Sequence, residues 1–316
     1  MVAVMLAGCA APVAPTIPAS ATLSPTSTAT ATIAPTPSLT PTDVPAATAT
    51  PSVTLTPLQA EQVAVLRAIL PDLNWVTDEC EYSKFPDASV ICDAQGNIIE
   101  LDLVADNLTS LSPRIAELTH LQSLNLSRNQ LTDLPPKLSQ LQDLVALNLS
   151  YNPITVLPPV VMNLKHLTSL DIGITQLVAL PSDLGRLESL RNLYLWEVEQ
   201  FSGDLSPVTQ LTGLEYLDAH SINVTKLPPQ IESLKHLNEL NLGGNDLTEL
   251  PSEIGQLSSL ETLELTYNHL TSLPPEIVHL SHLKKLDLQF QYTRIVLTPD
   301  ICKKLGPIIS PPTLCP

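Results

Sequence analysis

The sequence predicts an α/β solenoid whose stacked coils place a curved parallel sheet on the concave face and short helices or 3₁₀ turns on the convex face. Three observations predict this fold. Aliphatic side chains return at an interval of 23 residues over much of the chain. Aromatic residues make up only 3% of the chain, so aliphatic side chains must fill any large core. A proline recurs late in most units and restricts the returning segment to a short helix or turn.

Residues 1–9 are apolar and end in small residues directly before Cys9. An apolar run followed by small residues is typical of a signal peptide. The tetrad Leu6-Ala7-Gly8-Cys9 resembles the lipobox of bacterial lipoproteins. The resemblance implies a lipid on Cys9 and an extracytoplasmic protein that is lipid-anchored to the bacterial cell membrane. The alternative is an apolar N-terminus that carries no lipid.

Residues 10–56 consist almost entirely of Ala, Thr, Pro, Ser and Val, and Asp43 is their only charged residue. The recurring prolines forbid a continuous helix or a central strand. Too little bulky apolar surface is present to offset the entropy lost on ordering. We therefore expect a disordered linker with some polyproline II character.

Residues 57–97 are expected to form an N-terminal cap, since the end of a solenoid would otherwise expose its apolar interior. A helix is predicted over residues 57–70, with a proline in its first turn and Pro71 as its stop. Its apolar face consists of Val63, Leu66 and Ile69.

Residues 98–290 carry the repeat, in eight full units and one partial unit. Each unit places Leu or another aliphatic residue at its first, fourth and sixth positions, and further aliphatic residues return in its second half. Only the unit that begins at Leu190 departs in length, with 24 residues. The units begin at Ile98, Leu121, Leu144, Leu167, Leu190, Leu214, Leu237, Leu260 and Leu283.

This pattern resembles the leucine-rich-repeat family and covers about 190 residues. Alternation at the fourth and sixth positions fits a short strand, and stability must come from neighbouring coils because no unit buries its apolar face alone. The family's asparagine ladder implies a role for the ninth position. Asn129, Asn152, Asn245 and Asn268 fit this ladder, and Asp106 and Gln291 are polar substitutes. Thr175, Val198 and Ile222 interrupt it, which predicts altered turns in the middle coils.

The cysteines lie near the two ends of the repeat. Trp75, Cys80 and Cys92 resemble the cysteine-paired N-terminal cap of plant-type extracellular repeat proteins, which implies that Cys80 and Cys92 are paired. Residues 291–316 are expected to form the C-terminal cap, and they contain Cys302 and Cys315. Five cysteines thus divide into one lipid site and two local pairs, which need an oxidising compartment. The alternative is four free buried thiols in a cytosolic protein.

Metal, cofactor and catalytic sites are not expected. His120, His166, His236 and His282 all end their units, but no two belong to adjacent coils, so they cannot share a metal ion. An open concave sheet also gives a carboxylate pair little desolvation. We therefore expect no metal, no cofactor and no catalytic residue, and not an enzyme.

A net charge of −17, from 15 basic and 32 acidic residues, argues against nucleic acid as a partner. It also disfavours anionic membranes, so membrane contact is expected only through a lipid on Cys9.

Aromatic residues are scarce, yet many fall at exposed positions of the predicted concave strands. Exposed Trp and Tyr side chains are typical of binding hot spots. The alternative is that these rings only cover the sheet or pack against the irregular coil that begins at Leu190. The predicted ligand-binding residues are Tyr151, Tyr194, Trp196, Glu197, Tyr216, His220 and Tyr267.

We therefore predict a non-enzymatic, cell-envelope-anchored module that binds protein, peptide or glycan through its concave face. One alternative is a structural or adhesion protein in which the solenoid is a spacer. The other is a cytosolic signalling scaffold, in which case the lipobox assignment would be wrong.

Overall fold

The computed structural model describes residues 57–69, 88–105 and 107–315. The chain divides into two units, and all of the described residues belong to the second unit, Val53–Pro316. The predicted lipobox with Cys9 and the predicted linker lie outside the described residues, as do Trp75, Cys80 and Asp106.

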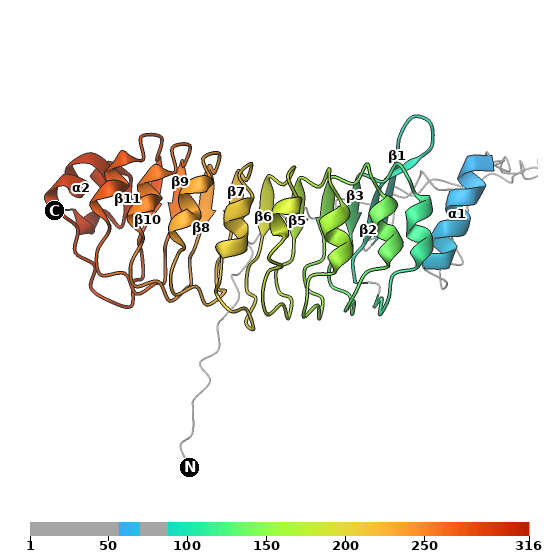
Figure 1. Ribbon diagram of the computed structural model, residues 1–316, viewed down its shortest axis with the longest axis horizontal. Coiled ribbons are helices and arrows are strands. Elements are labelled where there is room, and N and C mark those ends of the chain that lie inside the picture. The colour runs from blue at the N-terminus through green and yellow to red at the C-terminus, as the bar shows by residue number, and fades with distance from the viewer. Residues whose placement is uncertain (1–56, 70–87, 106, 316) are drawn as a thin grey trace, which may run out of the picture. The chain divides into compact units, whose positions relative to one another are not determined.

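The described part of the second unit is a row of coils that follow one another in chain order (Figure 1). Their strands form one eleven-stranded sheet, in the order β1 to β11. The pair β1–β2 is antiparallel, and every later pair is parallel. The strands are β1 Ala88–Cys92, β2 Ile98–Leu103, β3 Ser123–Asn125, β4 Ala146–Asn148, β5 Ser169–Asp171, β6 Asn192–Tyr194, β7 Tyr216–Asp218, β8 Glu239–Asn241, β9 Thr262–Glu264, β10 Lys285–Asp287 and β11 Ile309–Ser310.

The returning segments contain short 3₁₀ helices, and these form a second row beside the strands (Figure 1). Several begin next to the recurring prolines, whose fixed backbone angle suits a first helical turn. They are η1 Pro113–Glu117, η2 Pro136–Gln140, η3 Pro159–Asn163, η4 Leu184–Arg186, η5 Ser206–Gln210, η6 Pro229–Ser233, η7 Ser252–Gln256 and η8 Pro275–His279. The predicted leucine-rich-repeat solenoid, with a parallel sheet and 3₁₀ turns, is thus confirmed.

The core lies between the two rows and is built from the repeating aliphatic positions. Register places like residues side by side, so that Leu124, Leu147 and Leu170 are successive partners and all are buried. The third and fifth positions of each repeat unit, which flank the buried leucine at the fourth position, point to the opposite face. We call this the open face of the sheet; it corresponds to the predicted concave face.

The asparagine ladder is present and satisfies backbone groups between coils. The Asn152 side-chain oxygen accepts from the Leu131 N–H at 2.9 Å, and its amide nitrogen donates to three carbonyl oxygens. Asn129, Asn245 and Asn268 repeat this pattern, and Gln291 replaces it in the last coil.

The ladder is interrupted in the middle coils, as predicted. Thr175 makes a single hydrogen bond, from its hydroxyl to the Ile172 carbonyl. Val198 and Ile222 are buried aliphatic side chains that offer no such bond. The turn that follows each strand is nevertheless kept, because the eighth residue of every coil has a positive φ. These residues are Ala105, Arg128, Tyr151, Ile174, Glu197, Ser221, Gly244, Tyr267 and Phe290.

The helix α1, Pro57–Ile69, packs at the N-terminal end of the coils, and Val63, Leu66 and Ile69 are buried as expected. Gln62 in the same helix is also buried, and its side-chain oxygen accepts from the Ile98 N–H at 2.8 Å. The helix therefore supplies a hydrogen bond to the first coil as well as an apolar cover.

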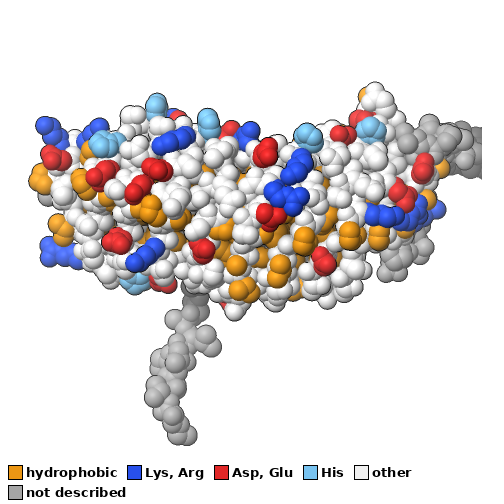
Figure 2. All heavy atoms as spheres, in the orientation of Figure 1, with side chains coloured by type: hydrophobic (Ala, Val, Ile, Leu, Met, Phe, Trp, Pro, Cys, Tyr) orange, Lys and Arg blue, Asp and Glu red, His pale blue; other side chains and the backbone are white. Residues whose placement is uncertain are grey.

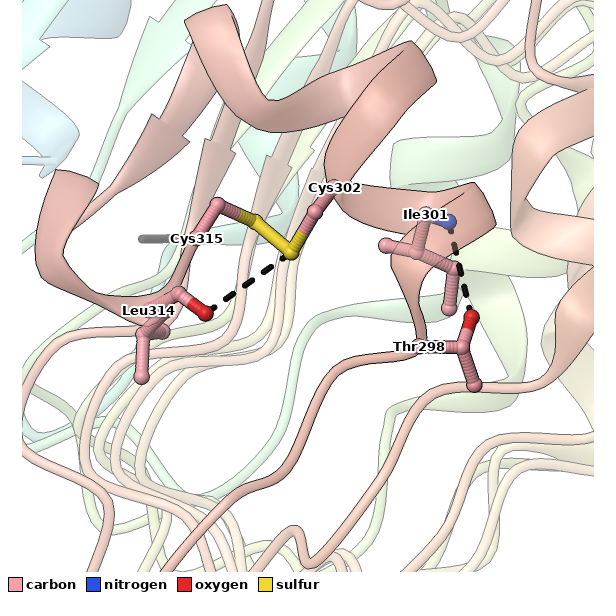
Figure 3. Close-up of a disulfide and its surroundings, with 5 residues drawn as sticks. All are labelled: Thr298, Ile301, Cys302, Leu314 and Cys315. Carbon is pink, nitrogen blue, oxygen red and sulfur yellow. Dashed lines mark hydrogen bonds between the residues drawn. A yellow bond between two sulfur atoms is a disulfide. The ribbon is translucent and has the colours of Figure 1, made fainter.

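The C-terminal end contains α2, Pro299–Leu305, the short 3₁₀ helices η9 Gly306–Ile308 and η10 Pro312–Leu314, and the edge strand β11. The Thr298 hydroxyl caps α2 by accepting from the Ile301 N–H (Figure 3). Cys302 and Cys315 form the predicted disulfide, with their Cα atoms 5.2 Å apart. At the other end, Cys92 is disulfide-bonded.

Candidate functional site

A cluster of rings comes from β6 and β7 and from the turns that follow β4, β6 and β7. We call Tyr151, Tyr194, Trp196, Tyr216 and His220 the central aromatic cluster. The centroids of Tyr194 and Tyr216 are 5.0 Å apart. Trp196 stacks on His220 at 5.9 Å, with an angle of 14° between the rings, and Tyr151 meets Trp196 edge-on at 5.7 Å. The structure thus brings together five of the seven predicted binding residues.

Trp196 takes its position from the coil before it. Gly173 occupies the same place in the preceding coil, and a Cβ atom there would collide with the indole ring. Burial raises the pKa of Asp171, which ends β5, and the nearby indole of Trp196 opposes that rise. The indole therefore packs against the backbone of Gly173 on one side, where no Cβ atom is present, and against the His220 ring on the other.

Glu197, the sixth predicted residue, joins the cluster through His220. The Nδ1 atom of His220 lies 2.7 Å from Asp218 Oδ1, and its Nε2 atom lies 3.8 Å from Glu197 Oε1. The hydrogen bond to Asp218 raises the pKa of His220, burial opposes this, and the charges of Asp218 and Glu197 add to the rise. The His220 side chain therefore lies between two carboxylates, those of Asp218 and Glu197.

Carboxylates border Tyr194 and Tyr216, the two tyrosines of the cluster that lie on strands. In the sheet register Tyr194 lies between Asp171 and Asp218, and Tyr216 pairs with Glu239. Burial raises the pKa of Asp171. Burial, followed by the nearby acids, raises the pKa of Tyr194 and raises that of Tyr216 to about 12. The phenols therefore stay neutral and lie in a negative field.

Tyr267, the seventh predicted residue, lies apart from the cluster. It follows β9, two strands beyond β7, and stacks on Phe290 at 4.7 Å. Tyr292 contacts Tyr267 and His269. Exposed fractions of 45% for Tyr267, 61% for Phe290 and 66% for Tyr292 leave this second group open to solvent.

Two hollows border the central cluster. A groove of about 1080 Å³ lies beside the interrupted ladder, and Tyr151, Thr175 and Glu197 are among the residues that line it. Ile174 also lines this groove with φ of 45°, which is strained for a β-branched residue. A smaller hollow of about 260 Å³ lies on the open face between Asn148, Asp171 and Tyr194. Both hollows are open, which suits an extended partner better than an enclosed small molecule.

The sequence analysis did not single out Arg128, Asp171 or Gly173 as site residues. The Arg128 guanidinium lies 4.3 Å from the centroid of the Tyr151 ring. Gly173 holds the position in its coil that Trp196 holds in the next one, and this absence of a side chain beside Trp196 is a sequence signal for where the indole packs. Arg128 and Tyr151 likewise hold the eighth position of successive coils, which places their side chains side by side.

The histidines that end their units lie apart from the cluster. His120 faces Asp143 at 3.6 Å, and His282 contacts the Ser258 carbonyl. Within the described ranges no group of three or more His, Cys, Asp or Glu side chains is arranged to hold a metal ion. Neither α1 nor α2, the α-helices of that part of the chain, has the length and apolar character to cross a bilayer.

These coils, their asparagine ladder and their open sheet face define a leucine-rich-repeat protein. The family model described as leucine-rich repeat region matches residues 100–224 and 229–307. The chain therefore belongs to the leucine-rich-repeat family, whose members are generally non-catalytic binding scaffolds. A search of curated proteins finds no match.

Solved structures show the same fold. A leucine-rich-repeat protein of Leptospira interrogans matches with 36% identity and a TM-score of 0.59, over 68% of this chain and 53% of that one. Internalin C2 of Listeria monocytogenes matches with 27% identity and a TM-score of 0.53, over 64% of this chain and 81% of that one. The Arabidopsis receptor kinase HAESA, solved with the peptide hormone IDA and the co-receptor SERK1, matches with 25% identity and a TM-score of 0.56, over 76% and 46%. The chain thus spans about half the length of the Leptospira and HAESA chains.

Proposed function

We propose that this protein is a non-enzymatic binding module that captures a protein or peptide on the open face of its middle coils. One observation carries the proposal: the central aromatic cluster gathers the only tryptophan of the described region with two tyrosines on adjacent strands. Half-buried Trp and Tyr side chains in a fixed arrangement are the kind of residue that dominates binding energy.

The family context supports a peptide or protein as the partner. Leucine-rich-repeat domains are typically protein- or peptide-binding modules. The Arabidopsis receptor kinase HAESA was solved with the peptide hormone IDA and the co-receptor SERK1. The leucine-rich-repeat ectodomain of the Arabidopsis receptor kinase GASSHO1/SCHENGEN3 was solved with CASPARIAN STRIP INTEGRITY FACTOR 2. The open hollows beside the cluster give an extended chain room to lie across several coils.

The test is a cross-linking pull-down from the native cell surface. Replacing Tyr194, Trp196 and Tyr216 together by Ala is expected to abolish capture while the circular dichroism spectrum stays that of the wild type. The matched control replaces Phe290 and Tyr292 by Ala, since these rings are exposed and lie outside the cluster. Capture that survives the triple replacement would remove the central aromatic cluster as the binding site.

We further propose that the module is anchored to the bacterial cell envelope by a lipid on Cys9. The Cys302–Cys315 disulfide supports this location over the cytosolic scaffold, because structural disulfides persist in oxidising compartments. Metabolic labelling with a fatty acid tests the anchor, since the label is expected on the wild type and not on Cys9→Ala. A labelled variant, or an unlabelled wild type, would exclude the anchor without touching the binding proposal.

A further inference from the structure

Tyr194 and Tyr216 alternate with acidic residues on the open face of the sheet. We call Asp171, Tyr194, Tyr216, Asp218 and Glu239 the tyrosine–carboxylate patch. One row of the sheet places Tyr194 between two aspartates, and the next places Tyr216 beside Glu239. Neighbouring strands are about 4.8 Å apart, so each ring has a carboxylate within one strand spacing. A small group that rests on the rings therefore reaches several carboxylates at once.

The patch holds an excess of negative charge. In the described part of the chain, neither Asp171 nor Glu239 takes part in any ion pair, and Asp218 pairs only with His220. Lys285 of β10, which feels the charge of Glu239, is already paired with Glu264. The acids act on both phenols, whose pKa values are raised by burial first and by these charges next. The surface is therefore set up to attract a positive group.

The open face already contains one example of the chemistry that such a group would use. Arg128 lies over the face of Tyr151, whose ring contacts Trp196 of the same cluster. A guanidinium or ammonium over an aromatic ring is favourable by about 0.5–1 kcal/mol at exposed sites, and by more when water is excluded. Figure 2 shows acidic, basic and apolar side chains interspersed on the face that it draws, whereas the patch combines rings and carboxylates without a basic residue.

We propose that the tyrosine–carboxylate patch receives a lysine or arginine side chain of a peptide partner. A neutral glycan would stack on the rings but would leave the carboxylates without a counter-charge. An acidic peptide would be repelled by the patch and by the chain's net charge of −17. This inference rests on the proposed function, and it adds the chemistry of the ligand.

The experiment selects dodecapeptides from a random phage-displayed library on the wild-type protein. We expect the selected peptides to be enriched in Lys or Arg. A selected peptide is then synthesised with its key Arg replaced by citrulline, which keeps the shape and removes the charge. Binding measured by calorimetry is expected to weaken about tenfold. Because the protein is unchanged in this comparison, altered folding cannot explain the loss.

A second comparison changes the protein in place of the peptide, with the double variant Asp171→Asn, Glu239→Gln. This variant is expected to bind the Arg peptide about tenfold more weakly than the wild type and to bind the citrulline peptide as the wild type does. The control, Glu232→Gln with Glu249→Gln, removes equal charge from exposed positions elsewhere and should bind as the wild type does. Selected peptides without basic residues, or equal binding of the Arg and citrulline peptides, would overturn the inference and leave the proposed function standing. Failure to select any peptide would overturn the inference, and selective binding of a neutral oligosaccharide instead would overturn both.

Discussion

The indole of Trp196 lies directly against Gly173 of the preceding coil, in space that the Cβ atom of any other residue would fill. Trp196 is thus held by the backbone of one coil and by the His220 ring of the next. A large half-buried ring fixed in this way loses little side-chain freedom on binding, which suits a hot-spot residue.

Gly173→Ala is expected to push the Trp196 ring out of place, because the added Cβ atom would collide with it. Overpacking of this kind costs about 1–3 kcal/mol. We expect a changed tryptophan fluorescence spectrum and a lower free energy of unfolding. Gly213→Ala is the control, since its Cβ atom meets only the flexible guanidinium of Arg191. Identical fluorescence in Gly173→Ala and the wild type would contradict this packing.

Asn152→Ala is expected to destabilise the protein more than Thr175→Ala does. The two residues hold the same position in successive coils, but Asn152 makes four hydrogen bonds and Thr175 makes one. An unsatisfied buried backbone group costs about 1–3 kcal/mol. We expect a loss of about 3 kcal/mol for Asn152→Ala and about 1 kcal/mol for Thr175→Ala in urea unfolding. Equal losses would show that the ladder is not interrupted at Thr175.

Removing the disulfide by Cys302→Ser with Cys315→Ser is expected to cost about 3 kcal/mol, because a loop of this length is no longer closed in the unfolded chain. Hydrogen exchange should quicken in α2 and β11 and stay unchanged in the middle coils. Equal unfolding midpoints of the variant and the oxidised wild type would show that the cap does not depend on this bond.

His220 is expected to make stability depend on pH. Its pKa in the folded protein is raised above the ordinary value of 6.5, chiefly by the hydrogen bond to Asp218. A raised pKa means that the stabilisation is complete below about pH 6.5 and is lost as the pH rises through the folded value. The difference in unfolding free energy between the wild type and His220→Gln should therefore shrink over that window. If that difference stays constant or grows as the pH rises, the hydrogen bond between His220 and Asp218 does not raise the pKa of His220.

The fold could be predicted because it depends on spacing alone. Leu124, Leu147 and Leu170 had to be neighbours once the coils stack in register, and the same register places Tyr194 near Tyr216. The interrupted ladder could also be seen in the sequence, but the groove beside it could not, because a groove depends on which side chains leave space.

The remaining features of the site depend on side-chain direction. Trp196 lies toward Gly173, and Arg128 lies over Tyr151, through torsions that the repeat pattern does not fix. Tyr267 was grouped with the cluster because it holds an equivalent position in its coil. Its ring contacts Phe290 instead, since it belongs to a coil two strands beyond β7.

The central claim is that the open face of the middle coils captures the partner. The most direct measurement places a photo-cross-linking amino acid at Tyr194, and separately at Val156, which is 68% exposed and lies outside the cluster. Illumination at the native cell surface is expected to give a covalent adduct from position 194 and none from position 156. An adduct from position 156 alone, or the same adducts from both positions, would contradict the claim.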